Sequence, residues 1–245
     1  MNALEVCGLN KKYPAFSLEN VSFCVKRGRI AGFLGRNGAG KSTTMKAIAG
    51  LVCADSGSVR IFGEERQAGG GLPASVGVLF GGAEFYSRRR PGSVASVFAR
   101  FYPQWNEDRY RRLLGQFSLD ERKRVCELSN GMKVKFQLAL ACSHGAELLV
   151  LDEPTSGLDP VSRAEVHSIL RAFAHEEGGA VLYSTQIVAD LEKCADDVIY
   201  IRGGRIVRAD EKGAFLRAYA QSDGTMPALE EIFLKEEGVC EGFAL

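Results

Sequence analysis

The sequence predicts an α/β fold, with a parallel sheet that carries a strand-rich N-terminal part and a helical insertion. Three observations predict it. Strand patterns fill the first third of the chain, apolar residues then recur at helical spacing from about residue 82 to 144, and strand-like runs separated by helical patterns return after that. Such alternation of strands and helices is typical of a parallel sheet covered by helices.

The strands of the first third are predicted from alternation and from punctuating residues. Residues 4–6 and 21–25 alternate apolar and polar side chains, and Arg27-Gly28 separates the second run from the apolar run 30–34. A turn signal at 54–57 precedes a short strand at 59–62.

The helical insertion is predicted from apolar faces. The first helix places four apolar residues on one face: Val94, Val97, Phe98 and Phe101. Asn106 is placed to cap a second helix, whose apolar face holds Tyr110, Leu113, Leu114 and Phe117.

The remaining elements follow the insertion. Strand-like runs lie at 148–151, 180–184 and 198–201, with helices beginning near Pro160 and Ile187. A short strand at 205–207 follows Gly203-Gly204. We expect a C-terminal helix to dock through three apolar side chains: Leu229, Ile232 and Phe233.

Composition excludes several classes of protein. With 245 residues, 46% of them apolar and 25% charged, the chain resembles neither a disordered nor a fibrous protein. A net charge of +1 lacks the broad positive field of a dedicated nucleic-acid binder, so no nucleic acid is expected. Seven cysteines without a CxxC pair indicate neither a disulfide scaffold nor a zinc site, and favour the reducing cytosol. Since no apolar run approaches the roughly 18 residues that cross a bilayer, a membrane role would need a partner.

A phosphate-binding motif follows the apolar run 30–34. Residues 35–42 fit G-x-x-x-x-G-K-[ST] and open a helix, which is the context that this motif requires. Its glycines let backbone N–H groups converge on an anion at a helix N-terminus. Lys41 would reach the terminal phosphates, and the Ser42 hydroxyl would bind Mg²⁺. The expected nucleotide-binding residues of this segment are Gly35, Asn37, Gly38, Ala39, Gly40, Lys41, Ser42 and Thr43.

Two carboxylates end the buried-type strand 148–151. Asp152 and Glu153 would emerge at the carboxyl edge of the parallel sheet, beside the phosphate-binding loop. The natural assignment gives Asp152 the Mg²⁺ ion and Glu153 the attacking water, as general base.

The chain resembles ATP-binding cassette (ABC) ATPases over nearly its whole length. The phosphate-binding motif, Leu128-Ser129-Asn130-Gly131-Met132, Asp152-Glu153 and Ser156-Gly157-Leu158-Asp159 occur in the family's order and spacing. The resemblance implies a P-loop NTPase (RecA-like) core with an N-terminal antiparallel β part. The core would comprise residues 1–81 and 145–210, the helical signature subdomain 82–144 and a C-terminal helical segment 211–245.

The resemblance also implies site residues and partners. Ser129 and Gly131 would contact the γ-phosphate of ATP held by an opposite subunit, and Asp159 would lie in the loop that crosses the dimer interface. Tyr13 matches the residue that stacks on adenine, although packing explains it equally well. The implied cofactors are ATP and Mg²⁺. The implied partners are a second cassette, identical or different, and an integral membrane permease that holds the chain at the inner face of the cell membrane.

Two residues depart from the family pattern. Gly81 stands where the family usually has a Gln near Mg²⁺, and Gln186 stands where it usually has a His near the γ-phosphate. An amide can hydrogen-bond a phosphate oxygen but carries no positive charge. We therefore expect nucleotide binding to persist and efficient hydrolysis to be reduced.

Three functions remain open at this stage. The first is the ATPase subunit of a transporter, the second a regulatory, catalytically weak cassette paired with a competent one, and the third a non-transport ABC ATPase. The third is disfavoured because the insertion contains neither heptads nor Cys pairs. The run Arg88-Arg89-Arg90 is either a solvated charge run, which we favour, or a docking patch.

Overall fold

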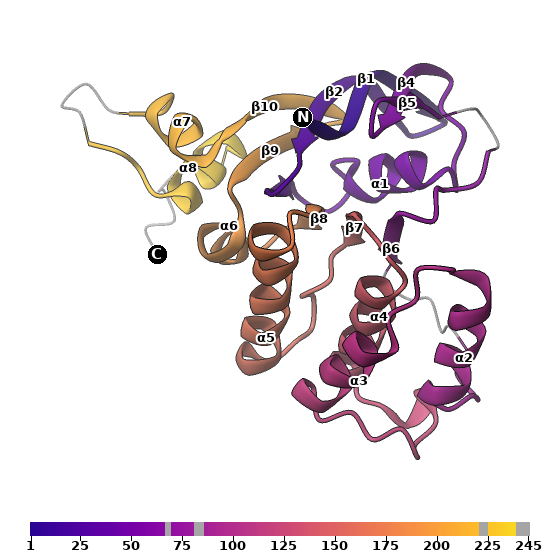
Figure 1. The fold of residues 1–245 in the computed structure, drawn as a ribbon. Helices are drawn as coiled ribbons and strands as arrows, with labels where there is room; N and C mark the ends of the chain where they lie inside the picture. Colours follow the sequence, from indigo (N-terminus) through magenta and orange to yellow (C-terminus); the bar gives the residue numbers. More distant parts are fainter. Residues whose placement is uncertain (67–69, 81–85, 221–224, 239–245) are drawn as a thin grey trace.

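The structure is a computed structural model that describes residues 1–66, 70–80, 86–220 and 225–238. Its N-terminal residues form a four-stranded antiparallel sheet in the order β2-β1-β4-β5 (Figure 1). The strands are β1 (Asn2–Tyr13), β2 (Phe16–Lys26), β4 (Ser56–Ile61) and β5 (Glu64–Glu65). The predicted strand at 59–62 thus begins earlier, at Ser56, and ends before Phe62, whose positive φ of 52° places it in a turn.

A six-stranded sheet in the order β10-β9-β3-β8-β7-β6 forms the centre of the fold. Its strands are β3 (Ile30–Leu34), β6 (Val76–Phe80), β7 (Leu148–Asp152), β8 (Ala180–Thr185), β9 (Asp197–Arg202) and β10 (Arg205–Glu211). All pairings are parallel except that of β10 with β9. Every residue of β3, β7 and β8 is buried, which explains their uninterrupted apolar sequences.

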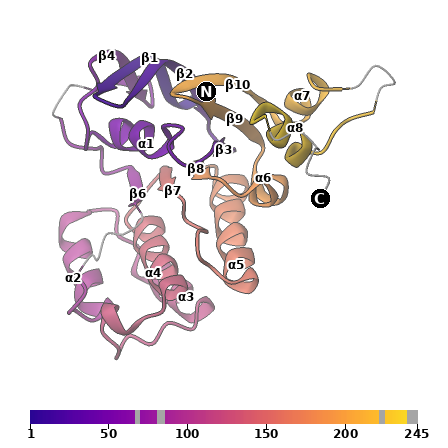
Figure 2. The same cartoon turned by 180° about the vertical axis from the view of Figure 1, so that it is seen from behind.

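Helices cover both faces of this sheet. In both views α1 (Lys41–Ala49) lies between the antiparallel sheet and the central sheet (Figures 1 and 2). Met45 and Ile48 of α1 share one core cluster with Leu4 of β1 and Val150 of β7. The other face packs against α4 (Asn130–Ser143), α5 (Pro160–Arg171) and α6 (Val188–Cys194), and a π-helical turn, Ala172–Glu176, extends α5.

The helical insertion forms a lobe at one end of the molecule (Figure 1). It consists of α2 (Pro91–Phe101), α3 (Glu107–Gln116), the 3₁₀ turn Val125–Glu127 and α4 (Asn130–Ser143). The predicted cap of α3 is confirmed, because Asn106 Oδ1 accepts a hydrogen bond from Arg109 N at 2.8 Å. Of the four apolar residues expected on one face of α2, Val94 is buried, whereas Phe101 is 77% exposed. Phe101 is the last residue of α2, and the ring of the partly buried Phe98 stacks on Tyr102.

The C-terminal residues add α7 (Lys212–Arg217) and α8 (Leu229–Glu236) at the side opposite the helical lobe (Figure 2). The predicted docking of the last helix is confirmed: Leu229 and Ile232 are buried, and the ring centroids of Phe233 and Tyr200 lie 5.8 Å apart in a T-shaped arrangement. Within the described ranges, none of the helices combines the length and the apolar character that crossing a bilayer requires.

Candidate functional site

The loop between β3 and α1 is shaped for an anion. Two of its glycines lie where no larger residue fits: a Cβ at Gly35 would come within 2.6 Å of the Ile201 carbonyl oxygen, and one at Gly40 within 2.6 Å of Leu18 Cδ2. Gly40 also has a φ of 111°, which L-residues rarely adopt. In contrast, nothing lies within 4 Å of a Cβ built on Gly38, so the tip of the loop is open. Open backbone at a helix N-terminus is a favourable environment for phosphate oxygens.

The Lys41 side chain is buried against the backbone of this loop. It is 3% exposed, and its Nζ donates hydrogen bonds to the Gly35 oxygen at 2.8 Å and the Arg36 oxygen at 3.2 Å. The same Nζ lies 3.3 Å from Oε1 of Glu153. The structure therefore brings the predicted phosphate-binding lysine and the predicted general base into direct contact.

Asp152 and Glu153 are held by one serine that the sequence analysis did not assign to the site. Ser184 Oγ, on the adjacent strand β8, donates to Asp152 Oδ1 at 2.6 Å and accepts from Glu153 N at 2.9 Å. The backbone of Glu153 has a φ of 50°, a conformation that costs a non-glycine residue about 1–3 kcal/mol. Strain of this kind persists only where the surroundings impose it, and it clusters at functional sites.

The donors for a cation are few. Ser42 and Thr43 are half-buried in the first turn of α1, and Asp152 is 9% exposed at the edge of the sheet. Among the described residues, no cluster of three or more His, Cys, Asp or Glu could hold a metal by itself. A hydroxyl, a carboxylate and phosphate oxygens suit Mg²⁺, which is usually bound through one or two carboxylates together with a nucleotide. The donor set therefore fits Mg²⁺ that arrives with ATP.

Gln186 follows β8 at the same edge of the sheet. Asp152 and Ser184 are paired in the β7–β8 register, so the ends of the two strands that carry Glu153 and Gln186 lie side by side. Gln186 is exposed, and the chain turns into α6 directly after it, with Ile187 N donating to Thr185 Oγ1 at 2.9 Å. The placement suits contact with a ligand, while the role of Gln186 stays a prediction.

Ser129, Gly131 and Asp159 form a second group, at the N-termini of α4 and α5. Ser129 Oγ caps α4 by accepting from Met132 N at 3.3 Å, and Asp159 caps α5 by accepting from Val161 N and Ser162 N, each at 3.0 Å. The hydrogen bonds with Ser162 lower the pKa of Asp159. A Cβ on Gly131 would lie 3.3 Å from Ser162 Oγ, so the two helix starts pack closely. Sequence reasoning predicted these three residues, and the structure places them near one another.

Tyr13 ends β1, where it pairs with Phe16 across the hairpin. Phe16 lies against the phosphate-binding loop, since a Cβ on Gly40 would be 2.9 Å from its Cζ. The Tyr13 ring is 37% exposed and carries Lys11 Nζ 5.7 Å from its centroid. The ring is thus available on the hairpin that borders the loop, and stacking on adenine stays a prediction.

The structure does not test the predictions made for Gly81 and for the arginine run 88–90. Gly81 lies in the segment 81–85, outside the described residues. Arg88, Arg89 and Arg90 are all exposed, and the Arg89 oxygen accepts from Val125 N at 2.9 Å, which joins this run to the segment before α4. Exposure suits both a solvated charge run and a docking patch.

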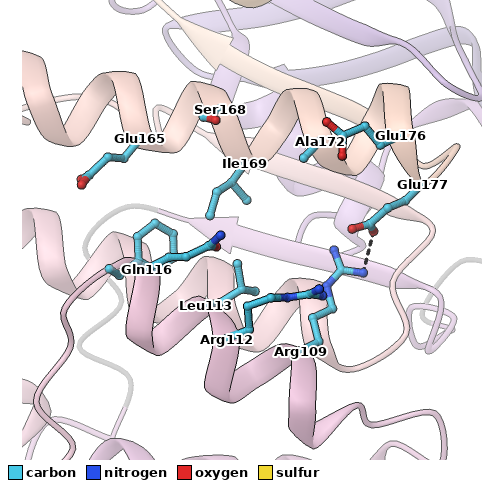
Figure 3. Close-up of a pocket in the computed structure, with 11 residues that line it drawn as sticks. Arg109, Arg112, Leu113, Gln116, Glu165, Ser168, Ile169, Ala172, Glu176 and Glu177 are labelled. Carbon is cyan, nitrogen blue, oxygen red and sulfur yellow. Dashed lines mark ion pairs between the residues drawn. The ribbon is translucent and has the colours of Figure 1, made fainter.

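A cleft of about 390 Å³ lies between α3 and α5 (Figure 3). Basic side chains of α3, Arg109 and Arg112, face acidic ones on the other wall, and Arg109 Nη1 lies 2.5 Å from Glu177 Oε2. Its lining comes from α3 and the residue after it, and from α5, the turn that extends α5 and the residue after that turn. The cleft therefore marks the junction between the helical lobe and the central sheet and is not part of the Lys41–Glu153 site.

Comparison with known proteins gives a consistent family. The family described as ABC transporter matches residues 18–156. The chain is 32% identical to the bacitracin transport ATP-binding protein BcrA of Enterococcus faecalis over 208 residues, which cover 83% of this chain and 68% of that protein. It is 32% identical to the aliphatic sulfonates import ATP-binding protein SsuB of Cupriavidus necator over 236 residues, with 95% and 77% covered.

Solved structures agree. The structure of an ATP-binding subunit of an ABC transporter superimposes with a TM-score of 0.83 at 29% identity, covering 95% of this chain and 98% of the other. At 20% identity, the fold is shared by the ATP-binding cassette MJ0796 in a dimeric, post-hydrolysis state bound to ADP and Pi, with a TM-score of 0.73 and coverage of 85% and 98%. The chain belongs to the ABC transporter family, as an ATP-binding subunit with a P-loop ATPase fold.

Proposed function

We propose that this chain binds Mg-ATP at the Lys41–Glu153 site, pairs with a second cassette around the nucleotide, and hydrolyses ATP to drive a separate membrane permease. The observation that carries the proposal is the 3.3 Å approach of Lys41 Nζ to Glu153 Oε1 inside the phosphate-binding loop. It supports a single centre that can hold terminal phosphates and activate water.

The roles of the residues follow from their chemistry. Lys41 and the loop N–H groups bind the phosphates, Ser42 and Asp152 hold Mg²⁺, and Tyr13 stacks on the adenine. Mg²⁺, when bound, neutralises charge on the phosphate oxygens. Glu153 accepts a proton from the water molecule whose oxygen attacks the γ-phosphorus, and ADP leaves. Gln186 donates an amide hydrogen bond to the γ-phosphate.

The second group of residues supports pairing. Ser129, Gly131 and Asp159 lie at two helix starts, where backbone N–H groups favour an anion, while Lys41 and Glu153 belong to another part of the chain. We infer that this group completes the nucleotide site of the opposite cassette. The arrangement requires either a homodimer or a heterodimer, with the chain held at the inner face of the membrane through its permease. We further propose the division into a core of 1–81 and 145–210, a helical subdomain of 82–144 and a C-terminal segment of 211–245.

One observation favours a second candidate function. Gln186 supplies a neutral dipole where a protonated side chain would add charge, which suits a catalytically weak, regulatory cassette. We favour the competent ATPase, because Lys41, Asp152 and Glu153 are all in place. Phosphate release measured with and without a candidate partner cassette separates the two functions.

The transporter role is tested by its partner. Affinity purification of the chain from gently solubilised membranes is expected to recover an integral membrane protein, identified by mass spectrometry. Recovery of nucleic acid or ribosomes alone would contradict the transporter proposal and favour a non-transport ABC ATPase.

A further inference from the structure

A buried polar cluster lies next to the site and outside every motif described above. It consists of Thr155, which follows Glu153 by two residues, Asp190 on α6, and Arg163 and His167 on α5. Thr155, His167 and Asp190 are 1%, 2% and 1% exposed. Polar side chains at this depth cost free energy unless they are paired, so the cluster needs a physical reason.

Asp190 is the centre of the cluster. Its Oδ2 accepts a hydrogen bond from Thr155 Oγ1 at 2.6 Å. Its Oδ1 lies 3.6 Å from both Arg163 Nε and His167 Nε2, and none of these three atoms has a hydrogen-bond partner among the residues that the structure describes. The carboxylate therefore makes one short hydrogen bond, to Thr155, and is balanced at longer range by the Arg163 charge.

His167 contributes no charge to this balance. Burial lowers its pKa, an effect larger than the opposing attraction of Asp190, so the imidazole is neutral near pH 7. Arg163 also donates from Nη2 to the Leu158 oxygen at 3.4 Å. The cluster thus joins α5 and α6 to the loop that follows Glu153.

The Thr155–Asp190 hydrogen bond links the segment after Glu153 to the helix that follows Gln186, and both residues are proposed to face the γ-phosphate. Glu153 is fixed on its N-terminal side by Ser184 Oγ, at 2.9 Å from its backbone nitrogen. On its C-terminal side, the first side chain anchored to another element is that of Thr155, held by Asp190. Asp190 in turn lies on the helix that begins directly after the Gln186 segment.

We propose that Asp190 is a positioning residue for ATP hydrolysis, which acts through Thr155 to hold Glu153 against the γ-phosphate. The inference rests on the proposed function of Glu153. Its physical basis is the sensitivity of catalysis to geometry, because a misplacement of about 1 Å costs a rate factor of about 10². The positive φ of Glu153 makes its position more sensitive to the loss of an anchor, because a strained backbone relaxes when its surroundings no longer hold it.

Thr155 is the better residue to change. Asp190→Ala would leave Arg163 without its carboxylate partner in a buried site and would endanger folding. Thr155→Val has nearly the same shape, removes only the hydroxyl donor, and leaves the Asp190–Arg163 pair in place. Thr155→Ser is the matched control, because it keeps the hydroxyl that reaches Asp190.

For the purified chain, we expect Thr155→Val to lower kcat for ATP hydrolysis by about tenfold or more, with the Kd for Mg-ATP changed by less than about threefold. The single variant Thr155→Ser should retain a kcat within about twofold of wild type. A kcat for Thr155→Val within about twofold of wild type would overturn the inference, as would an equal loss for Thr155→Ser.

A double-mutant cycle separates positioning from a general structural role. In a Glu153→Gln background, adding Thr155→Val should leave single-turnover cleavage of labelled ATP unchanged, because the group that is positioned has already been removed. A full additional loss in that background would contradict action through Glu153. If Glu153→Gln itself hydrolyses ATP at the wild-type rate, the proposed function fails. If Glu153→Gln is inactive and Thr155→Val is fully active, only the present inference fails.

Discussion

Lys41 Nζ and Glu153 Oε1 lie 3.3 Å apart, although the two residues come from different elements of the chain. The lysine leaves the first turn of α1 and the glutamate follows β7. A triphosphate that binds in the loop would compete for the ammonium, and the Glu153 carboxylate would then be available to a water molecule. The contact balances the charges of the two side chains.

Lys41→Ala should largely abolish ATP binding. A charge-assisted hydrogen bond is worth about 1.5–3 kcal/mol, which corresponds to a rise in Kd of roughly 10- to 150-fold. Titration with a fluorescent ATP analogue measures this rise. Lys46→Ala is the control, because Lys46 lies exposed on the same helix. An unchanged Kd for Lys41→Ala would contradict the assignment of the loop.

Gly40→Ala should destabilise the protein more than Gly38→Ala. Both glycines have positive φ, at 111° and 80°, and an L-residue in the left-handed region costs about 1–2 kcal/mol. At Gly40 the new Cβ would also come within 2.6 Å of Leu18 Cδ2, whereas nothing lies within 4 Å at Gly38. Denaturant unfolding of both variants gives the difference in the free energy of unfolding. Equal losses would show that the loop relaxes at no cost around Gly40.

Thiol alkylation should separate two classes of cysteine. Burial raises the pKa of Cys142 to about 11 and that of Cys194 to about 12, so both remain protonated and shielded near pH 8. Four described cysteines are exposed, and iodoacetamide should modify these first: Cys7, Cys24, Cys53 and Cys126. Peptide mass spectrometry before and after denaturation reads out each site. Rapid labelling of Cys142 in the native protein would mean that its core opens easily.

Gln186→His should raise the rate of hydrolysis several-fold without tightening ATP binding much. A protonated His adds positive charge near the γ-phosphate in the transition state, while losing a preorganised donor typically costs about 10²–10³ in rate. Because Gln retains a donor, the gain should be smaller than that factor. Steady-state phosphate release, with the membrane partner present, compares the variant with wild type. An equal or lower rate in Gln186→His would refute a site weakened by the amide.

The extent to which sequence anticipates this fold depends on the element. Buried parallel strands such as β3 and β7 are continuous apolar runs, and the caps Asn106, Ser129 and Asp159 have local signals, so their positions could be predicted. The full extent of β1 could not, because shifts in its pairing register, as between Val6 and Leu9, interrupt the alternation that marks a strand.

In the candidate site, too, only some of the residues can be predicted from the sequence. The proximity of Lys41 to Glu153 could be predicted, because the motifs place both residues at the carboxyl edge of the parallel sheet. Ser184 and Asp190 could not be predicted, because a single hydroxyl or carboxylate has no spacing signature and acts through residues far away in sequence. Ser184 lies beside Asp152 because of the parallel register of β7 with β8, which the sequence does not specify.

The central claim, that Glu153 activates water in a site that binds ATP independently of it, is tested most directly by phosphate release from wild type and Glu153→Gln. We expect the variant to bind Mg-ATP at least as tightly as wild type, to lose most of its turnover, and to form an ATP-dependent dimer on gel filtration. Glu147→Gln, which changes an exposed carboxylate just before the other end of β7, should behave as wild type. Wild-type turnover in Glu153→Gln would contradict the account.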